Sequence, residues 1–467
     1  MYDIIIIGAG SAGLGLSSFM NKAGFTVLLV DRADHHIGGD CLNFGCVPSK
    51  ALIHVAKQIW HAKEKAPQFG LTTSGDIDIK KVMDYIQHKQ NIIREHENAE
   101  YLRSTGIDVV LGHATFASST SIAVEGKEYH GKKIVVSTGS RPRELSIPGV
   151  EQAEVYTNET IFSIQTLPKQ FLFIGAGPIA VELGQAFQRL GSQVTFLIRS
   201  DAFLRKEDKE VATILLEQLK KEGCQFLFNT TPKEFVSPTS LVVTKKDESE
   251  ETLSFDAVFS GIGRIPNLDR LSSEKAHIEL QRNGKPVLNE YMQSTNKRVY
   301  IIGDAAGGLQ FTHAAELHIR LLLNNFFSPI KKKLNTDTFP WVTYTDPEIA
   351  TFGLNEKTLE ERGVSYTVID ESFSNDDRAI VDEGTCGRMK LFVHKNKLLG
   401  GTVISQHAGE ISQELMLVNS SQLSLRHLFN KIYPYPTAGR VIGTTMVKYF
   451  SDKTFTTYKK MLKWLYH

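Results

Sequence analysis

The order of apolar and polar positions predicts short buried strands that alternate with helices. Ile4–Ile7 is an unbroken apolar run, which is typical of a central parallel strand buried on both faces. A helical stretch and a second strand over residues 25–30 follow this run. The same order returns later, with an apolar run over residues 171–174, a helical stretch, and a strand over residues 194–198. Parallel sheets with crossover helices are therefore expected in two places.

A glycine-rich turn follows the first apolar run, with glycines at Gly8, Gly10 and Gly13. Glycines at this spacing allow a tight turn and let the backbone approach a pyrophosphate that lies on the helix N-terminus. Asp31 ends the second strand, where a carboxylate can accept hydrogen bonds from both hydroxyls of an adenosine ribose. Arg32 follows Asp31 and is also expected to contact the cofactor. This order of a strand, glycines, a helix, a second strand and an acidic residue is a specific indication of a dinucleotide site. The alternative is a glycine turn that arose by chance, and it does not explain the acidic residue at this position.

The second apolar run carries a similar turn, with Gly175 and Gly177. At the spacing that separates Asp31 from the first turn, the second turn has Ile198, followed by Arg199 and then Arg205. A guanidinium pairs with the oxygens of a 2′-phosphate, whereas a carboxylate would repel them. The alternative is that both arginines are solvated surface residues. Loss of the acid together with gain of arginine predicts that NADPH is preferred over NADH.

Composition narrows the class of protein. A length of 467 residues predicts about three domains of roughly 150 residues. The 53 basic and 52 acidic residues give a net charge of +1, which argues against a nucleic-acid partner. No run reaches the roughly 18 apolar residues of a transmembrane helix, and the first strand begins too early for a signal peptide to precede it. We therefore expect a multi-domain enzyme of the cytoplasm.

Two of the four cysteines form a close pair, Cys41 and Cys46, inside the segment GGDCLNFGCVPSK. Four residues separate them, so that a disulfide can close within the first helical turn. The helix N-terminus and Lys50 would lower the pKa of a thiolate, which favours Cys46 as the thiolate that faces a flavin. A zinc site needs further ligands that this spacing does not supply, and inert buried thiols would not need a turn framed by glycine and proline. The pair is predicted to be redox-active.

The segments GAGSAG, GGDCLNFGCVPSK, GAGPIAVE, GIGRIPN and IIGDAAG together resemble the class I pyridine nucleotide-disulfide oxidoreductases, which include lipoamide dehydrogenase, glutathione reductase and mercuric reductase. The resemblance runs nearly end to end. It implies FAD as a bound cofactor, a homodimer, Cys46 as the charge-transfer thiol and Cys41 as the interchange thiol that meets substrate. It also implies that Lys50 pairs with Glu182 near the flavin.

The resemblance implies an α/β fold with two Rossmann-like dinucleotide-binding domains of the glutathione reductase type and an α+β dimerisation domain. The FAD domain is expected over residues 1–145 and 265–335, the nicotinamide domain over 146–264, and the dimerisation domain over 336–467. Asp304 follows an apolar strand and a glycine, where it can hold flavin ribityl hydroxyls. The remaining expected cofactor contacts are Gly39, Thr138, Gly139, Gly263 and Ala314.

The chain departs from the family near its C-terminus. Members that reduce disulfides carry a catalytic His and a Glu that orients it, and this chain has Tyr435 and Arg440 at those positions. A phenol with a pKa near 10 does not exchange protons at neutral pH as imidazole does. Mercuric reductase also has a Tyr there, but it carries a C-terminal cysteine pair, whereas this chain has no cysteine after Cys386.

These observations predict an NADPH-dependent FAD enzyme that passes electrons through Cys41 and Cys46 to an atypical acceptor: a metal ion, a quinone-like compound or an unusual disulfide. The alternatives are a dihydrolipoyl dehydrogenase with a displaced base and a redox-sensing flavoprotein. The C-terminal segment 453–467 predicts a basic amphipathic helix, which either touches an anionic membrane surface or packs on its own subunit or dimer partner. Its apolar face is Phe455, Tyr458, Leu462 and Leu465, and its lysines are Lys453, Lys459, Lys460 and Lys463.

Overall fold

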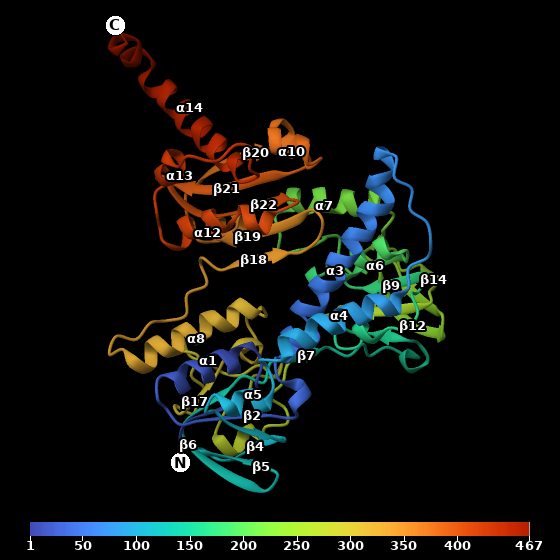
Figure 1. Ribbon diagram of the computed structural model, residues 1–467, viewed down its shortest axis with the longest axis vertical. Helices are drawn as coiled ribbons and strands as arrows, with labels where there is room; N and C mark the ends of the chain where they lie inside the picture. The colour runs from blue at the N-terminus through green and yellow to red at the C-terminus, as the bar shows by residue number, and fades with distance from the viewer. Residues whose placement is uncertain (467) are drawn as a thin grey trace. The chain divides into compact units, whose positions relative to one another are not determined.

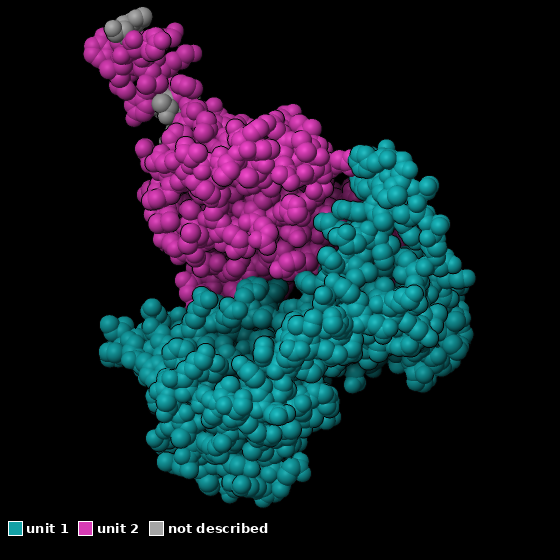
Figure 2. Space-filling view, viewed as in Figure 1, with its two compact units in different colours: residues 1–175, 189–197, 230–334 teal, residues 176–188, 198–229, 335–467 magenta. Residues whose placement is uncertain are grey.

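The computed structural model describes residues 1–466, with the side chains of residues 453, 454, 456 and 457 excepted. The chain forms two compact units (Figure 2): residues 1–175, 189–197 and 230–334 make the first, and residues 176–188, 198–229 and 335–467 make the second. The three-domain division expected from the sequence stays a prediction.

The helices and strands follow one another as Figure 1 labels them. The α-helices are α1 (Ser11–Lys22), α2 (Gly39–Asn43), α3 (Cys46–Trp60), α4 (Ile79–Arg94), α5 (Ala99–Ser104), α6 (Pro178–Leu190), α7 (Lys209–Lys221), α8 (Thr312–Phe327), α9 (Glu356–Glu361), α10 (Asp377–Val381), α11 (Ala408–Ile411), α12 (Gln413–Ser420), α13 (Arg426–Asn430) and α14 (Arg440–Leu465). The strands are β1 (Tyr2–Ile7), β2 (Val27–Asp31), β3 (Asp108–Leu111), β4 (Ala114–Ser118), β5 (Ser121–Val124), β6 (Lys127–Val136), β7 (Ser140–Pro142), β8 (Val155–Tyr156), β9 (Gln170–Ile174), β10 (Gln193–Ile198), β11 (Gln225–Phe228), β12 (Thr231–Ser237), β13 (Ser240–Thr244), β14 (Glu250–Ser254), β15 (Ala257–Ser260), β16 (Arg264–Pro266), β17 (Val299–Ile301), β18 (Pro340–Thr343), β19 (Glu348–Gly353), β20 (Thr367–Ser372), β21 (Arg388–His394) and β22 (Lys397–Ser405).

The first unit is built on a parallel sheet in the order β3-β2-β1-β6-β17. The apolar run in β1 explains its central place, because alternate side chains of a strand point to opposite faces. Ile4 and Ile6 enter one hydrophobic core, and Ile5 and Ile7 enter another. All four are at most 4% exposed. The predicted strand, buried on both faces, is therefore present.

Helices α1 and α8 cover one face of this sheet. Leu16 and Met20 of α1 pack in the same core as Ile319 and Leu322 of α8. The opposite face lies against the antiparallel pair β4-β5, whose Phe116 and neighbours form the second core. This packing holds the carboxyl end of β1 in place, where the glycine turn begins.

A second parallel sheet contains β10, β9, β15 and β8, in that order. Beside it in the sequence, β12, β13 and β14 form a three-stranded antiparallel sheet, and β7 pairs with β16. The strand β9 leads into the second glycine turn, as the apolar run over residues 171–174 predicts. Both expected parallel sheets are thus observed.

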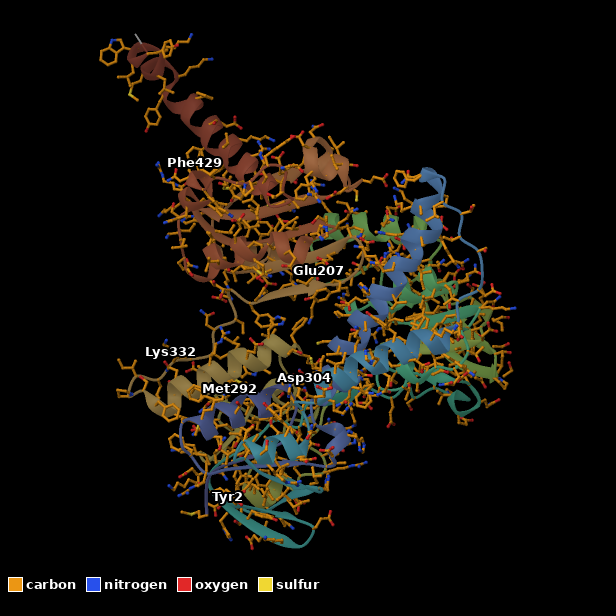
Figure 3. All side chains as sticks on the ribbon, in the orientation of Figure 1. Tyr2, Glu207, Met292, Asp304, Lys332 and Phe429 are labelled. Carbon is orange, nitrogen blue, oxygen red and sulfur yellow. The ribbon has the colours of Figure 1, made fainter. Side chains whose placement is uncertain are left out.

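The second unit contains an antiparallel sheet in the order β18-β19-β22-β21-β20. Its core takes side chains from α11, α12, α13 and the first turns of α14. Lys390 on β21 pairs with Asp208 at 2.9 Å, with the two side chains 11% and 12% exposed. Glu207, labelled in Figure 3, accepts a hydrogen bond from the Trp341 indole at 2.6 Å. Among the described residues, no helix combines the length and apolar character that crossing a membrane requires.

Candidate functional site

The first glycine turn brings the backbone of Gly8 and Gly13 into direct contact. A Cβ atom added at Gly13 would lie 1.9 Å from the carbonyl oxygen of Gly8. Gly8 itself has φ +102°, which side chains rarely tolerate, and its added Cβ would lie 2.5 Å from the carbonyl oxygen of Ser137. The turn therefore closes only with glycine at these positions. It lies between β1 and the N-terminus of α1, an arrangement that suits a pyrophosphate.

The carboxylate of Asp31 lies beside this turn at the end of β2. Its Oδ2 accepts a hydrogen bond from the backbone N–H of Ala9 at 2.6 Å, and its Oδ1 accepts one from Arg32 at 2.7 Å. Burial raises the pKa of Asp31, and these backbone hydrogen bonds act in the opposite direction. Both oxygens keep acceptor capacity for ribose hydroxyls. The turn and this acid together fit the adenosine half of FAD. The Arg32 guanidinium lies 3.4 Å from the His36 ring nitrogen.

The cysteine segment packs directly on the first glycine turn. A Cβ added at Gly39 would lie 2.6 Å from the Cα of Gly10, and Gly39 has φ +60°. Cys41 belongs to α2, and Cys46 is the first residue of α3. The expected placement of both cysteines in one helical turn was therefore wrong, because α2 ends at Asn43 and Gly45 caps the N-terminus of a separate helix, α3. Both cysteines are free thiols, Cys41 half-buried and Cys46 exposed.

The two thiols have opposite acidities. A hydrogen bond from Cys41 is the largest cause that lowers the pKa of Cys46, which falls to about 6 against the opposing effect of burial. Thr312 and the charge of Lys50 lower it further, whereas Asp40 raises it. The same hydrogen bond and burial raise the pKa of Cys41. These opposite shifts favour Cys46 over Cys41 as the thiolate of the pair, and the charge-transfer role of Cys46 stays a prediction.

Thr312 is a site residue that the sequence did not indicate. Its hydroxyl lies 3.3 Å from the sulfur of Cys46, although the two residues are far apart in the chain. Thr312 is the first residue of α8, and Cys46 is the first residue of α3. Helix N-termini carry partial positive charge, so both helices favour a thiolate at this point.

Arg264 joins the cysteine segment to the segment of Asp304. Its guanidinium is 9% exposed and donates to Asp40 at 3.0 Å, to Asn158 at 3.0 Å and to the Ser140 hydroxyl at 2.7 Å. Ser140 in turn donates to the carboxylate of Asp304 at 2.7 Å. Asp304 is labelled in Figure 3, and burial raises its pKa. Arg264 lies in the segment GIGRIPN, and no local pattern in the sequence predicts these contacts.

Most other predicted cofactor contacts lie near this network. The antiparallel pairing of β7 with β16 places Gly139 opposite Asn267 at one end of the ladder and Gly263 opposite Arg143 at the other end. Thr138 donates from its hydroxyl to the carbonyl of Asn267 at 2.7 Å, and the carbonyl of Gly139 accepts from the N–H of the same residue at 3.0 Å. Ala314 is fully buried on α8, two residues after the Thr312 hydroxyl. Their contact with FAD stays a prediction.

The second glycine turn is tight at its first glycine, where an added Cβ would lie 2.7 Å from the Gly261 carbonyl oxygen, and open at its second. Gly175 has φ +102°, but a Cβ added at Gly177 would meet no atom within 4 Å. Arg199 and Arg205 are both exposed, and neither forms an ion pair with another residue that the structure describes. Their guanidiniums are thus available to a phosphate. Whether they bind a 2′-phosphate stays a prediction.

The remaining predicted residues belong to different units. Lys50, in the first unit, donates to the Ser49 hydroxyl at 3.3 Å. Glu182, in the second, is 6% exposed and accepts from the backbone N–H of Tyr344 at 2.9 Å. The predicted pairing of Lys50 with Glu182 therefore stays a prediction.

Tyr435 and Arg440 contact each other in the second unit. The Arg440 guanidinium carbon lies 5.1 Å from the centre of the Tyr435 ring, which is a cation–π geometry. Tyr435 is 66% exposed. Within the part of the chain that the structure describes, the Tyr435 hydroxyl forms no hydrogen bond to a basic group. The two residues are therefore adjacent, as an acid–base dyad would be, but their chemistry is different.

Two substitutions should move the pKa of Cys46 in opposite directions. Thr312→Val removes a hydrogen bond to the thiolate and should raise the pKa by about one unit, given roughly 1.5 kcal/mol for such a bond. Asp40→Asn removes a nearby negative charge and should lower it. Mass spectrometry of alkylated peptides from the reduced protein, across pH, measures both values in a Cys386→Ser background. Shifts of the same sign would contradict this description of the site.

Comparisons with known proteins agree with these features. The sequence model of the pyridine nucleotide-disulphide oxidoreductases matches residues 2–318, and that of their dimerisation domain matches residues 339–446. A mercuric reductase from Staphylococcus aureus is 30% identical over 97% of this chain and 83% of its own length. A dihydrolipoyl dehydrogenase from Buchnera aphidicola subsp. Schizaphis graminum is 31% identical over 94% of each chain.

Solved structures agree on the fold. The HOCl-induced flavoprotein disulfide reductase RclA from Escherichia coli superimposes with a TM-score of 0.85, at 26% identity, over 96% of this chain and 99% of its own. A Cu(II) complex of the same protein gives a TM-score of 0.83 at 25% identity. One family assignment follows from the two matched domains, from the relatives and from the glutathione reductase type of fold. The chain belongs to the pyridine nucleotide-disulphide oxidoreductase family and is an NAD(P)H- and FAD-dependent oxidoreductase.

Proposed function

We propose that this enzyme passes electrons from NADPH through FAD to the Cys41–Cys46 pair, and from there to a thiophilic metal ion such as Cu(II). The observation that carries the proposal is the combination of an acidic thiol at Cys46 with the exposed, cation-covered phenol of Tyr435. A thiolate binds soft metal ions directly, and it needs no proton shuttle to do so. Disulfide exchange, by contrast, depends on a group that protonates the leaving thiolate.

The cysteine pair can supply both electrons for this reaction. Two Cu(II) ions take one electron each as the thiolate of Cys46 and the thiol of Cys41 join in a disulfide. The products are two Cu(I) ions and one proton, which leaves from Cys41. A bound FAD would supply the hydride equivalent taken from NADPH, and the Cys41–Cys46 disulfide would accept its two electrons and one proton as one thiolate and one thiol. The charges of Lys50 and the helix N-termini favour the thiolate form at Cys46 after each cycle.

The relatives support a metal acceptor in two ways. The Staphylococcus aureus relative is a mercuric reductase, and RclA has been solved as a Cu(II) complex. The sequence has no cysteine after Cys386, whereas the resemblance implies a C-terminal cysteine pair in mercuric reductases. We therefore favour Cu(II) over Hg(II).

An acceptor screen under NADPH tests the proposal. Cu(II), Hg(II), glutathione disulfide, lipoamide and quinones are compared by NADPH oxidation, and Cu(I) is measured with a colorimetric chelator. Cu(II) should give the highest turnover, and this turnover should depend on the cysteine pair. Faster reduction of lipoamide would identify a disulfide reductase, which is the second candidate because dihydrolipoyl dehydrogenases are among the relatives. Reduction of the pair with no turnover of any acceptor would indicate a redox sensor.

NADPH preference should depend on the two exposed arginines. Arg199→Ala with Arg205→Ala should raise the KM for NADPH about 100-fold, since a hydrogen bond to a charged group is worth roughly 1.5 kcal/mol and each arginine loses at least one. The KM for NADH should change little in the same protein, which makes NADH the internal control. A wild-type enzyme that uses NADH as well as NADPH would contradict the prediction. Asp201, two residues after Arg199 and also exposed, would then be the candidate for a ribose contact.

The dimerisation domain over residues 339–446 supports a homodimer as the working form. Membrane contact by the C-terminal segment is a separate proposal, which concerns where the enzyme acts rather than what it reduces.

A further inference from the structure

The last helix, α14, changes character along its length. Its first turns belong to the core of the second unit, where Val441, Ile442 and Met446 are at most 3% exposed. The match to the dimerisation domain ends at the last of these residues. From Asp452 onward, every residue whose side chain is described is exposed. Figures 1 and 2 show this half of the helix standing out from the body of its unit. The exposed half of α14 therefore lies beyond the residues that match the dimerisation domain.

The exposed half of α14 has one apolar face. Phe455, Tyr458, Leu462 and Leu465 follow one another at spacings of three or four residues, which places them on one side of a helix. Leu465 is 60% exposed, and the other three range from 36% to 58%. An exposed apolar stripe of this length marks a surface that binds something. The amphipathic helix expected from the sequence is present, although the side chain of Lys453 and the residue His467 lie outside the described part.

Lysines lie along one edge of this stripe and on the side of the helix beyond that edge, since Lys459 follows Phe455 by four residues and Lys460 and Lys463 lie farther round the helix. Lys459, Lys460 and Lys463 are all exposed, and none of them forms an ion pair within the described part of the chain. No acidic residue follows Asp452 in the sequence. The segment therefore has a purely positive polar face, whereas the whole protein has a net charge of only +1. This concentration of charge requires a negatively charged partner.

Aromatic residues complete the pattern near the end of the helix. Trp464 is 76% exposed, and Tyr466 is 88% exposed. Indole and phenol rings have an apolar body and a polar edge, and they are enriched at the boundary between lipid and water. A second copy of this helix is a poor partner, because it would bring three more lysines toward the same charge. Anionic lipid matches both the apolar stripe and the lysines.

We infer that residues 455–466 form a peripheral membrane anchor, which lies in the surface of an anionic bilayer with the Phe455–Leu465 stripe toward the acyl chains. The lysines then reach the lipid headgroups, because long side chains place their charge in water while their stems cover apolar surface. The inference does not depend on which acceptor the enzyme reduces.

Sedimentation of the full-length holoenzyme with lipid vesicles tests the anchor. The protein should bind vesicles of phosphatidylglycerol and phosphatidylethanolamine, and it should not bind vesicles of phosphatidylcholine alone. Lys459→Gln with Lys463→Gln should weaken binding about 25-fold, because each lysine near an anionic surface contributes about fivefold. Leu462→Glu with Leu465→Glu should abolish binding. High salt should weaken binding of the wild type, since screening shortens the reach of the lysines.

Matched controls separate the anchor from general surface effects. Lys80→Gln with Lys81→Gln removes two exposed lysines of α4, and Phe69→Glu with Leu71→Glu removes two exposed apolar side chains. Both controls should bind vesicles as the wild type does, and all variants should keep NADPH oxidation. Equal binding to both vesicle types overturns the inference. The inference is also overturned if the wild type does not bind vesicles and Leu462→Glu with Leu465→Glu converts the dimer to monomers in sedimentation-velocity runs. The apolar stripe would then be a contact between subunits.

Discussion

Cys41→Ser is expected to lower acceptor turnover by at least about 1,000-fold, the usual scale for loss of a residue that reacts covalently. The variant leaves Cys46 as a lone thiol, so the pair can no longer close to a disulfide or deliver two electrons. NADPH should still reduce the bound FAD in a single turnover. Stopped-flow absorbance measures that half-reaction, and steady-state NADPH oxidation with Cu(II) measures the whole cycle.

Cys386→Ser is the matched control for this experiment. Cys386 is another free thiol of the chain, and its side chain is exposed. Partial desolvation of the Cys386 sulfur raises its pKa, whereas the pKa of Cys46 is lowered. Its replacement should leave both measurements unchanged. If Cys386→Ser lowered turnover as much as Cys41→Ser did, the redox centre would not be the Cys41–Cys46 pair. If Cys41→Ser kept full turnover, electrons would leave the enzyme without passing through the pair.

Gly13→Ala is expected to remove FAD from the enzyme. The added methyl group would lie 1.9 Å from the carbonyl oxygen of Gly8, and backbone atoms must move to relieve the overlap. Overpacking of this kind costs about 1–3 kcal/mol or more, and the movement widens the turn that the pyrophosphate needs. The purified variant should have a much lower ratio of flavin to protein absorbance and a lower Tm.

Gly177→Ala is the matched control in the second glycine turn. Its added methyl group meets no atom within 4 Å, so the fold and the FAD content should stay as in the wild type. The second turn already has Ala180 where the first has Gly13, which agrees with the looser packing there. Full FAD occupancy in Gly13→Ala would show that the first turn does not approach the cofactor as closely as we expect.

Local patterns predicted the framework of the first unit well. The run Ile4–Ile7 indicated a strand buried on both faces, and its alternate side chains do enter two different cores. Gly8 and Gly13 indicated a tight turn, and a Cβ added at Gly13 would lie 1.9 Å from the Gly8 carbonyl oxygen, so that only glycine fits there. These features depend on residues that are neighbours in the sequence, and this is why the sequence alone was sufficient.

Contacts between distant segments were beyond such reasoning. Nothing around Thr312 indicates that its hydroxyl lies 3.3 Å from the Cys46 sulfur, since only the packing of α8 brings them together. Arg264 lies in the segment GIGRIPN. Its hydrogen bonds to Asp40 and Asn158 join segments whose proximity no local pattern predicts. The junction at Gly45 was missed for a different reason, because spacing alone cannot distinguish one helix turn from two adjoining helices.

The distance along the chain between Cys46 and Thr312 has a consequence for biosynthesis. The two residues are 266 positions apart, so a ribosome that adds 5–20 residues per second needs roughly 10–50 s to pass from one to the other. During that interval the nascent chain has both cysteines but lacks α8 and Thr312 with it. The full acidity of Cys46 is therefore acquired only late in synthesis, when the segment that completes its surroundings has emerged.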